Sequence, residues 1–171
     1  PSAVLKIIFE DTNTVPTDCI NNKNYSTYAG TGENAINLWW YHTYLGYNPY
    51  TGKNISGYIL HIGQNGGVKA DADCTRLFYG LTYLGCYGDG SAFENIENLD
   101  VSNVTNMKEM FAKCTYGVNL YLGYHFDTSK VTNMDSMFFG SNFYHLSLGS
   151  KFNTSSVQSM SKMFCDVKVM D

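Results

Sequence analysis

Apolar residues recur at fixed intervals in the second half of the chain, and their spacing there is typical of a helix. The clearest copy has Val131, Met134, Met137 and Phe138 at positions i, i+3, i+6 and i+7. Side chains at these intervals lie along one stripe of an α-helix. The pattern therefore predicts a short helix over this segment.

A second pattern precedes each helix-like segment. The phrases Leu120-Tyr-Leu-Gly123 and Leu146-Ser-Leu-Gly149 alternate in a way that predicts a short strand with both Leu side chains on one face. In both copies a Phe follows the Gly after 15 residues. Thr132 or Asn133 is suited to cap the start of the helix. The sequence therefore predicts that each unit consists of a strand, a bend, a short helix and a returning segment.

These units repeat along the chain. The closing aromatic residues are Phe111, Phe138 and Phe164, which are 27 and 26 residues apart. Self-similarity at such a period is typical of stacked repeats. A more divergent first unit ends at Phe78, and an insertion of about 11 residues before Phe111 predicts an extra loop in the second unit. The sequence therefore predicts an α/β repeat fold, a solenoid of about four coils.

Residues 1–57 lack the repeat, although residues 3–9 and 55–62 have the composition of strands. A solenoid exposes apolar core at its ends, so terminal units have to act as caps. We therefore expect a β-rich N-terminal capping region at 1–57 and the solenoid at 58–171. Residues 167–171 resemble the start of another strand, which predicts that the solenoid is truncated at the C-terminus.

Composition excludes several function classes. A formal charge of −4 with 15% charged residues forms no basic stripe, which argues against nucleic acid as the partner. No apolar run approaches the roughly 20 residues that span a bilayer, so membrane insertion of this segment is not expected. The five cysteines form no C-x-x-C pair, and Cys74 aligns with Met107 and Met134, which predicts a buried apolar role. We found no catalytic motif and expect neither an enzyme nor a cofactor or metal.

The segment from Phe126 to Phe138 reads F-D-T-S-K-V-T-N-M-D-S-M-F, and the segments ending at Phe111 and Phe164 match it closely. This phrase resembles the tandem repeat of BspA-type leucine-rich surface proteins of host-associated bacteria. The resemblance covers residues 93–171 firmly and 58–92 loosely. It implies a right-handed, leucine-rich-repeat-like solenoid on a secreted or surface-anchored protein used for adhesion or protein binding.

Candidate binding residues lie outside the repeated apolar positions. His61 and Tyr121 lie between the Leu positions and are expected to point out from the strand face, where Tyr124, His125, Tyr144 and His145 flank them. Trp39 and Trp40 are candidates for a sugar platform, although strand alternation predicts that one of them turns inward. Ordinary cross-strand pairing is the alternative for the first set, and core packing for the second.

Asp100, Asp127 and Asn153 align from coil to coil and are each followed two residues later by Ser. Such a ladder of carboxylates can hold calcium, but Asp and Ser are also the natural residues of a tight bend, which we favour.

These observations predict a non-enzymatic adhesion or protein-interaction domain of a secreted or surface-anchored bacterial protein, with a host or microbial surface protein or glycan as its partner. Two alternatives stay open. One is a structural stalk without a ligand, and the other is a carbohydrate-binding module that uses the N-terminal aromatic residues.

Overall fold

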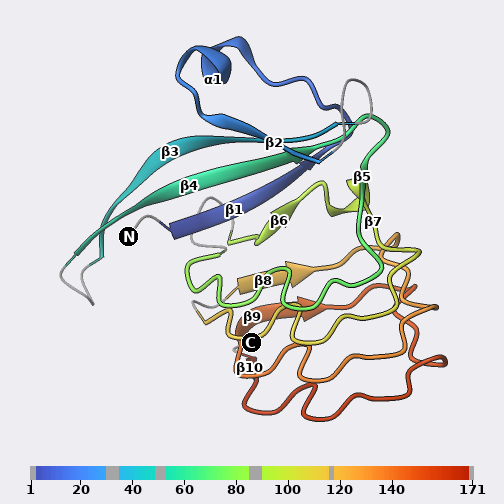
Figure 1. Ribbon diagram of the computed structural model, residues 1–171. Coiled ribbons are helices and arrows are strands. Elements are labelled where there is room, and N and C mark those ends of the chain that lie inside the picture. The colour runs from blue at the N-terminus through green and yellow to red at the C-terminus, as the bar shows by residue number, and fades with distance from the viewer. Residues whose placement is uncertain (1–2, 30–34, 49–52, 85–89, 116–117, 170–171) are drawn as a thin grey trace.

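The computed structural model describes residues 3–29, 35–48, 53–84, 90–115 and 118–169, which form a sheet lying across one end of a stack of repeats (Figure 1). The regular elements, in chain order, are β1 (Ala3–Glu10), α1 (Thr17–Asn21), β2 (Tyr25–Ala29), β3 (Ile36–Asn48), β4 (Lys53–Gly63), β5 (Val68–Lys69), β6 (Phe93–Glu94), the 3₁₀ turn η2 (Ile96–Asn98), β7 (Leu99–Asp100), β8 (Val118–Tyr121), β9 (Asn142–Ser147) and β10 (Lys168–Val169).

The N-terminal sheet has the strand order β2-β3-β4-β1-β6. β3 pairs antiparallel with β2 and β4, whereas β1 pairs parallel with β4 and β6. Leu5, Ile7 and Phe9 of β1 are buried, as the alternating pattern predicts. Strands were expected at residues 3–9 and 55–62, and β1 and β4 confirm both. α1 lies over the face of the sheet that is turned away from the repeats (Figure 1).

The repeats stack through short parallel strands. β8, β9 and β10 form a three-stranded sheet in the order β10-β9-β8, and β5 pairs with β7. The Leu-x-Leu-Gly phrases form or follow these strands. A Cβ atom at Gly149 would lie 1.7 Å from the carbonyl oxygen of Gly123, so a side chain cannot be accommodated where the two coils meet.

The helix expected in each coil is absent. The one α-helix among the described residues is α1, which precedes the repeats. Glu109, Ser136 and Lys162, in the middle of the three helix-like segments, have φ angles of 55°, 54° and 56°. An α-helix requires φ near −63°, so these segments cannot be helical. The predicted fold class, a right-handed α/β solenoid with a helix in each coil, is therefore wrong. The described structure is mostly β-sheet and turns.

Two consecutive turns take the place of each predicted helix. In the third repeat, the N–H of Met137 donates to the carbonyl of Met134, and the N–H of Phe139 donates to the carbonyl of Ser136. Met134 and Met137 stand at the two ends of the first turn, and both side chains are buried. The spacing i, i+3, i+6, i+7 therefore fits two turns as well as a helix. Asn133 accepts the N–H of Asp135 at 2.9 Å and so closes a turn, not a helix start.

The turn segments form a continuous ladder of hydrogen bonds. We call residues 73–80, 106–113, 133–140 and 159–166 together the turn ladder. Four backbone N–H groups of each of its first three segments, at alternate residues, donate to four carbonyls of the next segment at 2.8–3.0 Å. Isolated parallel bridges join Asp73, Asn106, Asn133 and Ser159 in the same register. Each repeat is therefore held by its neighbours more than by its own residues.

One core runs through both parts of the molecule. Phe78, Phe111, Phe138 and Phe164 stack in sequence, with ring centroids 5.3, 5.7 and 5.4 Å apart. The ring centroids of Phe9 in β1 and Phe78 lie 6.3 Å apart, so the sheet and the repeats share apolar contacts.

Cys74 is buried beside this core, which confirms its predicted apolar role, and burial raises its thiol pKa to about 11. Of the predicted extra loop, residues 85–89 lie outside the described residues.

Candidate functional site

The predicted binding residues fall into two separate places. His61, Trp39 and Trp40 belong to β3 and β4 of the N-terminal sheet. The remaining candidates lie on or just after β8 and β9 of the repeats and are Tyr121, Tyr124, His125, Tyr144 and His145. They therefore do not form one surface.

Trp39 and His61 are packed into the sheet. Trp39 is 3% exposed, and its ring stacks on that of His61 with centroids 5.4 Å apart. The Nδ1 atom of His61 lies 2.8 Å from Oε1 of Glu10. Trp40 is half-buried and lies on the opposite face of β3, as alternation between adjacent residues requires. The two Trp rings therefore do not form a joint platform.

The aromatic residues of the repeats are exposed and pair with imidazole rings. Tyr121 is 45% exposed and stacks on His145 with ring centroids 6.4 Å apart. Tyr124 is 68% exposed, and the centroid of its ring lies 4.5 Å from that of the His125 ring. Tyr144 is also exposed. These rings are rigid and have a polar tip, which makes them suited to contact with a partner.

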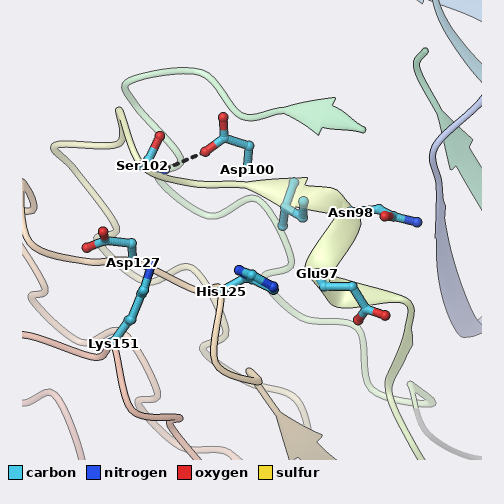
Figure 2. Close-up of a pocket in the computed structure, with 8 residues that line it drawn as sticks. Glu97, Asn98, Asp100, Ser102, His125, Asp127 and Lys151 are labelled. Carbon is cyan, nitrogen blue, oxygen red and sulfur yellow. Dashed lines mark hydrogen bonds between the residues drawn. The ribbon is translucent and has the colours of Figure 1, made fainter. Parts of the chain in front are cut away.

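A groove of about 430 Å³ opens beside His125. Its lining comes from three consecutive repeats and consists of Glu97, Asn98, Leu99, Asp100, Ser102, His125, Asp127 and Lys151. Figure 2 shows His125 between Asp127 and Lys151 on one side and Glu97 on the other. His125 thus joins the groove to the exposed ring of Tyr124.

The groove is built by equivalent positions of successive repeats. Asn98, His125 and Lys151 each directly precede the apolar residue that opens the returning half of the coil. We call these three residues the variable column. His125 and Lys151 lie on the same side of the groove, whereas the Asn98 side chain points away from them (Figure 2) and donates to the carbonyl of Phe9 at 3.1 Å. The column is polar, and its residue type changes at every step.

Asp100 and Asp127 close tight turns at the edge of the groove. Each accepts a backbone N–H at 2.9 Å, from Ser102 and Ser129 respectively (Figure 2 shows the first). Asn153 makes the same bond to Ser155 at 2.8 Å. The predicted turn role of this ladder is confirmed. Within the part of the chain that the structure describes, no three His, Cys, Asp or Glu residues are grouped as a metal site.

The two carboxylates are ionised at neutral pH. Hydrogen bonds from the hydroxyl and the N–H of Ser102 hold the pKa of Asp100 below its usual value of 3.8, and Lys69 and Lys130 lower it further. For Asp127 the N–H and hydroxyl of Ser129 have the same effect on the pKa, helped by Lys151 and Lys130. Hydrogen bonds that favour the charged form lower a carboxyl pKa. The groove therefore offers charged acceptors.

Sequence reasoning identified His125 but not Glu97, Asn98 or Lys151 as parts of a site. Asn98 and Lys151 could have been identified by aligning the repeats with one another. They occupy the same position as His125, two residues before the aligned Asp100, Asp127 and Asn153. Glu97 lies in η2, and we see no equivalent signal for it.

A comparison with models of protein families identifies the family of the chain. A family model described as "Mycoplasma protein of unknown function, DUF285" matches residues 73–171, more than half of the chain. The chain belongs to this family. The match begins at Asp73, the first residue of the turn ladder, so the DUF285 region contains all four turn segments. No curated protein and no solved structure matches the chain. None of the described helices is long and apolar enough to cross a membrane.

Proposed function

We propose that this DUF285 chain is a non-enzymatic interaction domain of a secreted or surface-anchored bacterial protein. It binds a host or microbial protein or glycan through the exposed side of its repeats. The observation that carries the proposal is the groove at the variable column, with the exposed Tyr124 and His125 rings beside it.

Fixed and changing positions of the repeats have different roles. Val131, Met134 and Phe138 of the repeated phrase are fully buried, so their recurrence is explained by packing. Of the variable column, Asn98 has a structural role, because its amide donates to the carbonyl of Phe9 in β1, whereas His125 and Lys151 line the groove. Stacked repeats commonly bind partners through positions that the scaffold leaves free to change.

The resemblance of the repeated phrase to BspA-type surface proteins supports the proposed location and the adhesive role. Family membership alone supports neither, because the DUF285 description assigns no function. The architecture of a protein does not determine its ligand, so the proposal rests on the residues of the site.

Binding of the fluorescently labelled chain to host cells, microbial cells and immobilised surface proteins tests the proposal. Binding is expected, and a Tyr124→Ala/His125→Ala variant is expected to bind at least about tenfold more weakly, because buried aromatic contacts dominate interface energies. Tyr25→Ala is the matched control, since Tyr25 is also exposed but lies on β2 of the N-terminal sheet. Absence of binding to all of these surfaces would favour a structural stalk. Binding that is weakened equally by Tyr25→Ala would contradict the proposed site.

A further inference from the structure

We infer that the last segment of the turn ladder, residues 159–166, is a docking edge for a turn segment of the same type that belongs to a separate chain. The edge lies at the end of the stack that is turned away from the N-terminal sheet (Figure 1), and none of the residues lining the groove belongs to it. The inference therefore goes beyond the proposed function and does not depend on it. It follows from unused N–H groups, exposed apolar side chains and the direction of the hydrogen bonds.

The hydrogen bonds between segments of the turn ladder all run in one direction. In the third segment, the peptide group between Asn133 and Met134 takes part in two of them. Its carbonyl accepts the N–H of Met107 at 2.9 Å, and its N–H donates to the carbonyl of Ser159 at 2.8 Å. A trans peptide group points these two atoms in opposite directions. Each inner segment therefore presents four carbonyls to the segment before it and four N–H groups to the segment after it.

The last segment has the same four N–H groups, but the described residues contain no segment after it. Its carbonyls accept from the third segment, as that of Met163 does from Phe138 at 3.0 Å. No acceptor within the described part of the chain binds the backbone N–H groups at the four equivalent positions, which are Met160, Lys162, Phe164 and Asp166. A partner that pairs with this edge has to offer carbonyls at the same spacing.

The apolar side chains of the last segment are exposed where their equivalents are buried. Met160 is 45% and Phe164 is 48% exposed, whereas the equivalent Met134 and Phe138 are fully buried. The ring of Phe164 stacks on that of Phe138, with the centroids 5.4 Å apart. The exposed part of the Phe164 ring offers a similar contact to the aromatic ring of an incoming segment.

An ordinary β-strand does not match this edge. Each edge of a strand presents N–H groups as well as C=O groups, so some of its N–H groups would face the four N–H groups of the last segment. A turn segment of the same type instead presents four carbonyls in a row, as the inner segments of the ladder do. The edge therefore selects a turn segment over a strand.

A second copy of this chain cannot supply that segment from its first repeat. Cys74 and Phe78 of the first turn segment are buried, and the ring of Phe78 contacts that of Phe9 in β1. An incoming Phe164 therefore cannot stack on Phe78. The N-terminal sheet thus prevents head-to-tail docking of identical copies, which would otherwise propagate into a filament. The occupant is a turn segment of another chain whose carbonyl edge is not covered by such a sheet.

Titration of the full chain with a synthetic peptide of residues 126–151, which contains the third turn segment, tests the inference. Amide hydrogen exchange followed by NMR is the readout. The peptide is expected to slow exchange of the four unused N–H groups at least about tenfold, because hydrogen bonding protects amides from exchange. A Met134→Ser/Phe138→Ser version of the peptide and an alternating Val-Thr peptide of equal length are expected to leave these amides unprotected.

Two matched variants of the chain locate the docking edge. Phe164→Ala is expected to weaken binding of the peptide about tenfold, because it removes the exposed aromatic contact. Leu77→Ala is the control, since Leu77 is 49% exposed but belongs to the first turn segment, at the opposite end of the ladder. This variant is expected to bind the peptide as tightly as the unchanged chain does.

A fusion separates weak docking from none. The peptide sequence is joined behind residue 171 through a flexible Gly/Ser linker, which raises its effective concentration to about the millimolar range. The inference is overturned if the four amides stay unprotected even in this fusion, if the Val-Thr peptide protects them equally, or if both variants lose the same affinity. Protection that appears when the chain is concentrated without peptide would show that a second copy is the occupant and would also overturn it.

Discussion

The N-terminal sheet and the repeats use backbone hydrogen bonds in different ways. β3 and β4 are 13 and 11 residues long and pair as an antiparallel hairpin, so the sequence separation of paired residues changes steadily, from the pair Asn48 and Lys53 to the pair Asn37 and Gly63. The strands of the repeats are two to six residues long, and their turns bond to residues about one repeat later. The sheet is thus specified by local alternation, whereas the repeats are specified by agreement between copies.

This difference also separates the two sets of candidate residues. In the sheet, the rings of Trp39 and His61 stack on each other and are used for packing. In the repeats, His125 and Lys151 reach the groove from equivalent positions, whereas the Asn98 side chain donates to the carbonyl of Phe9 in the sheet. Stacking therefore brings polar side chains of successive repeats to one surface.

The largest effect is expected from the aromatic column of the repeats. Phe138 is fully buried between Phe111 and Phe164. Phe138→Ala is expected to lower the free energy of unfolding by about 3–5 kcal/mol, the usual cost of removing a buried aromatic side chain. Phe164→Ala is the control, because Phe164 occupies the same position but is 48% exposed and is expected to cost less than half as much. Urea titration followed by circular dichroism measures both.

The same variant tests whether the two regions unfold together. Both Trp residues of the chain, Trp39 and Trp40, lie in β3, so Trp fluorescence reports on the N-terminal sheet alone. Because Phe9 and Phe78 join the two regions in one core, Phe138→Ala is expected to shift the fluorescence and circular dichroism transitions equally. A fluorescence transition that stays at its wild-type urea concentration would show that the sheet is independent of the repeats.

Acid is expected to weaken the repeats through their turn carboxyls. Hydrogen bonds from Ser102 and Ser129 lower the pKa of Asp100 and Asp127 below 3.8 in the folded protein. A lowered folded pKa contributes stability above pH 3.8, and this contribution is lost as the pH falls through the folded pKa values. The free energy of unfolding is therefore expected to fall below about pH 4. An Asp100→Asn/Asp127→Asn variant is expected to show a shallower fall, which denaturation at a series of pH values measures. An unchanged slope would mean that these turns do not hold ionised carboxylates.

A smaller effect is expected from the ion pair between Arg76 and Glu109, which joins the first two turn segments. Arg76 is largely exposed, and exposed ion pairs contribute little to stability because water and salt screen them. A double-mutant cycle with Arg76→Ala and Glu109→Ala is expected to give a small coupling energy at low salt and a smaller one at high salt. A large coupling energy that salt does not change would show that this charge pair has a larger part in joining the repeats.

The sequence correctly predicted those parts of the fold in which a pattern of apolar residues is compatible with only one structure. Alternation identified β1 and β4, and the alignment of repeats placed Cys74 in the core beside its equivalents. The apolar spacing around Met134 and Phe138 has two solutions, a helix and a pair of turns. No local signal marked the positive φ angle of Ser136, because Ser is not a residue that favours it.

The candidate site could be predicted only in part for a related reason. His125 was identifiable as an imidazole that flanks the outward-facing positions of a predicted strand. Its neighbours in the groove, Asn98 and Lys151, become recognisable only when the register between repeats is known. The hydrogen bonds of the turn ladder set that register, and they join residues that no local pattern links.

The turns of the ladder are the basis of this account, because they set the register between repeats, and Ser136 tests them most directly. Ser136 has a φ of 54°, and no side-chain hydrogen bond is among its interactions. At a positive φ, glycine is favoured over alanine by about 1 kcal/mol, whereas within an α-helix alanine is favoured by a similar amount. Urea denaturation of Ser136→Gly and Ser136→Ala is therefore expected to show the glycine variant as the more stable one. A more stable alanine variant would contradict the turn ladder and would instead support a helix at this position.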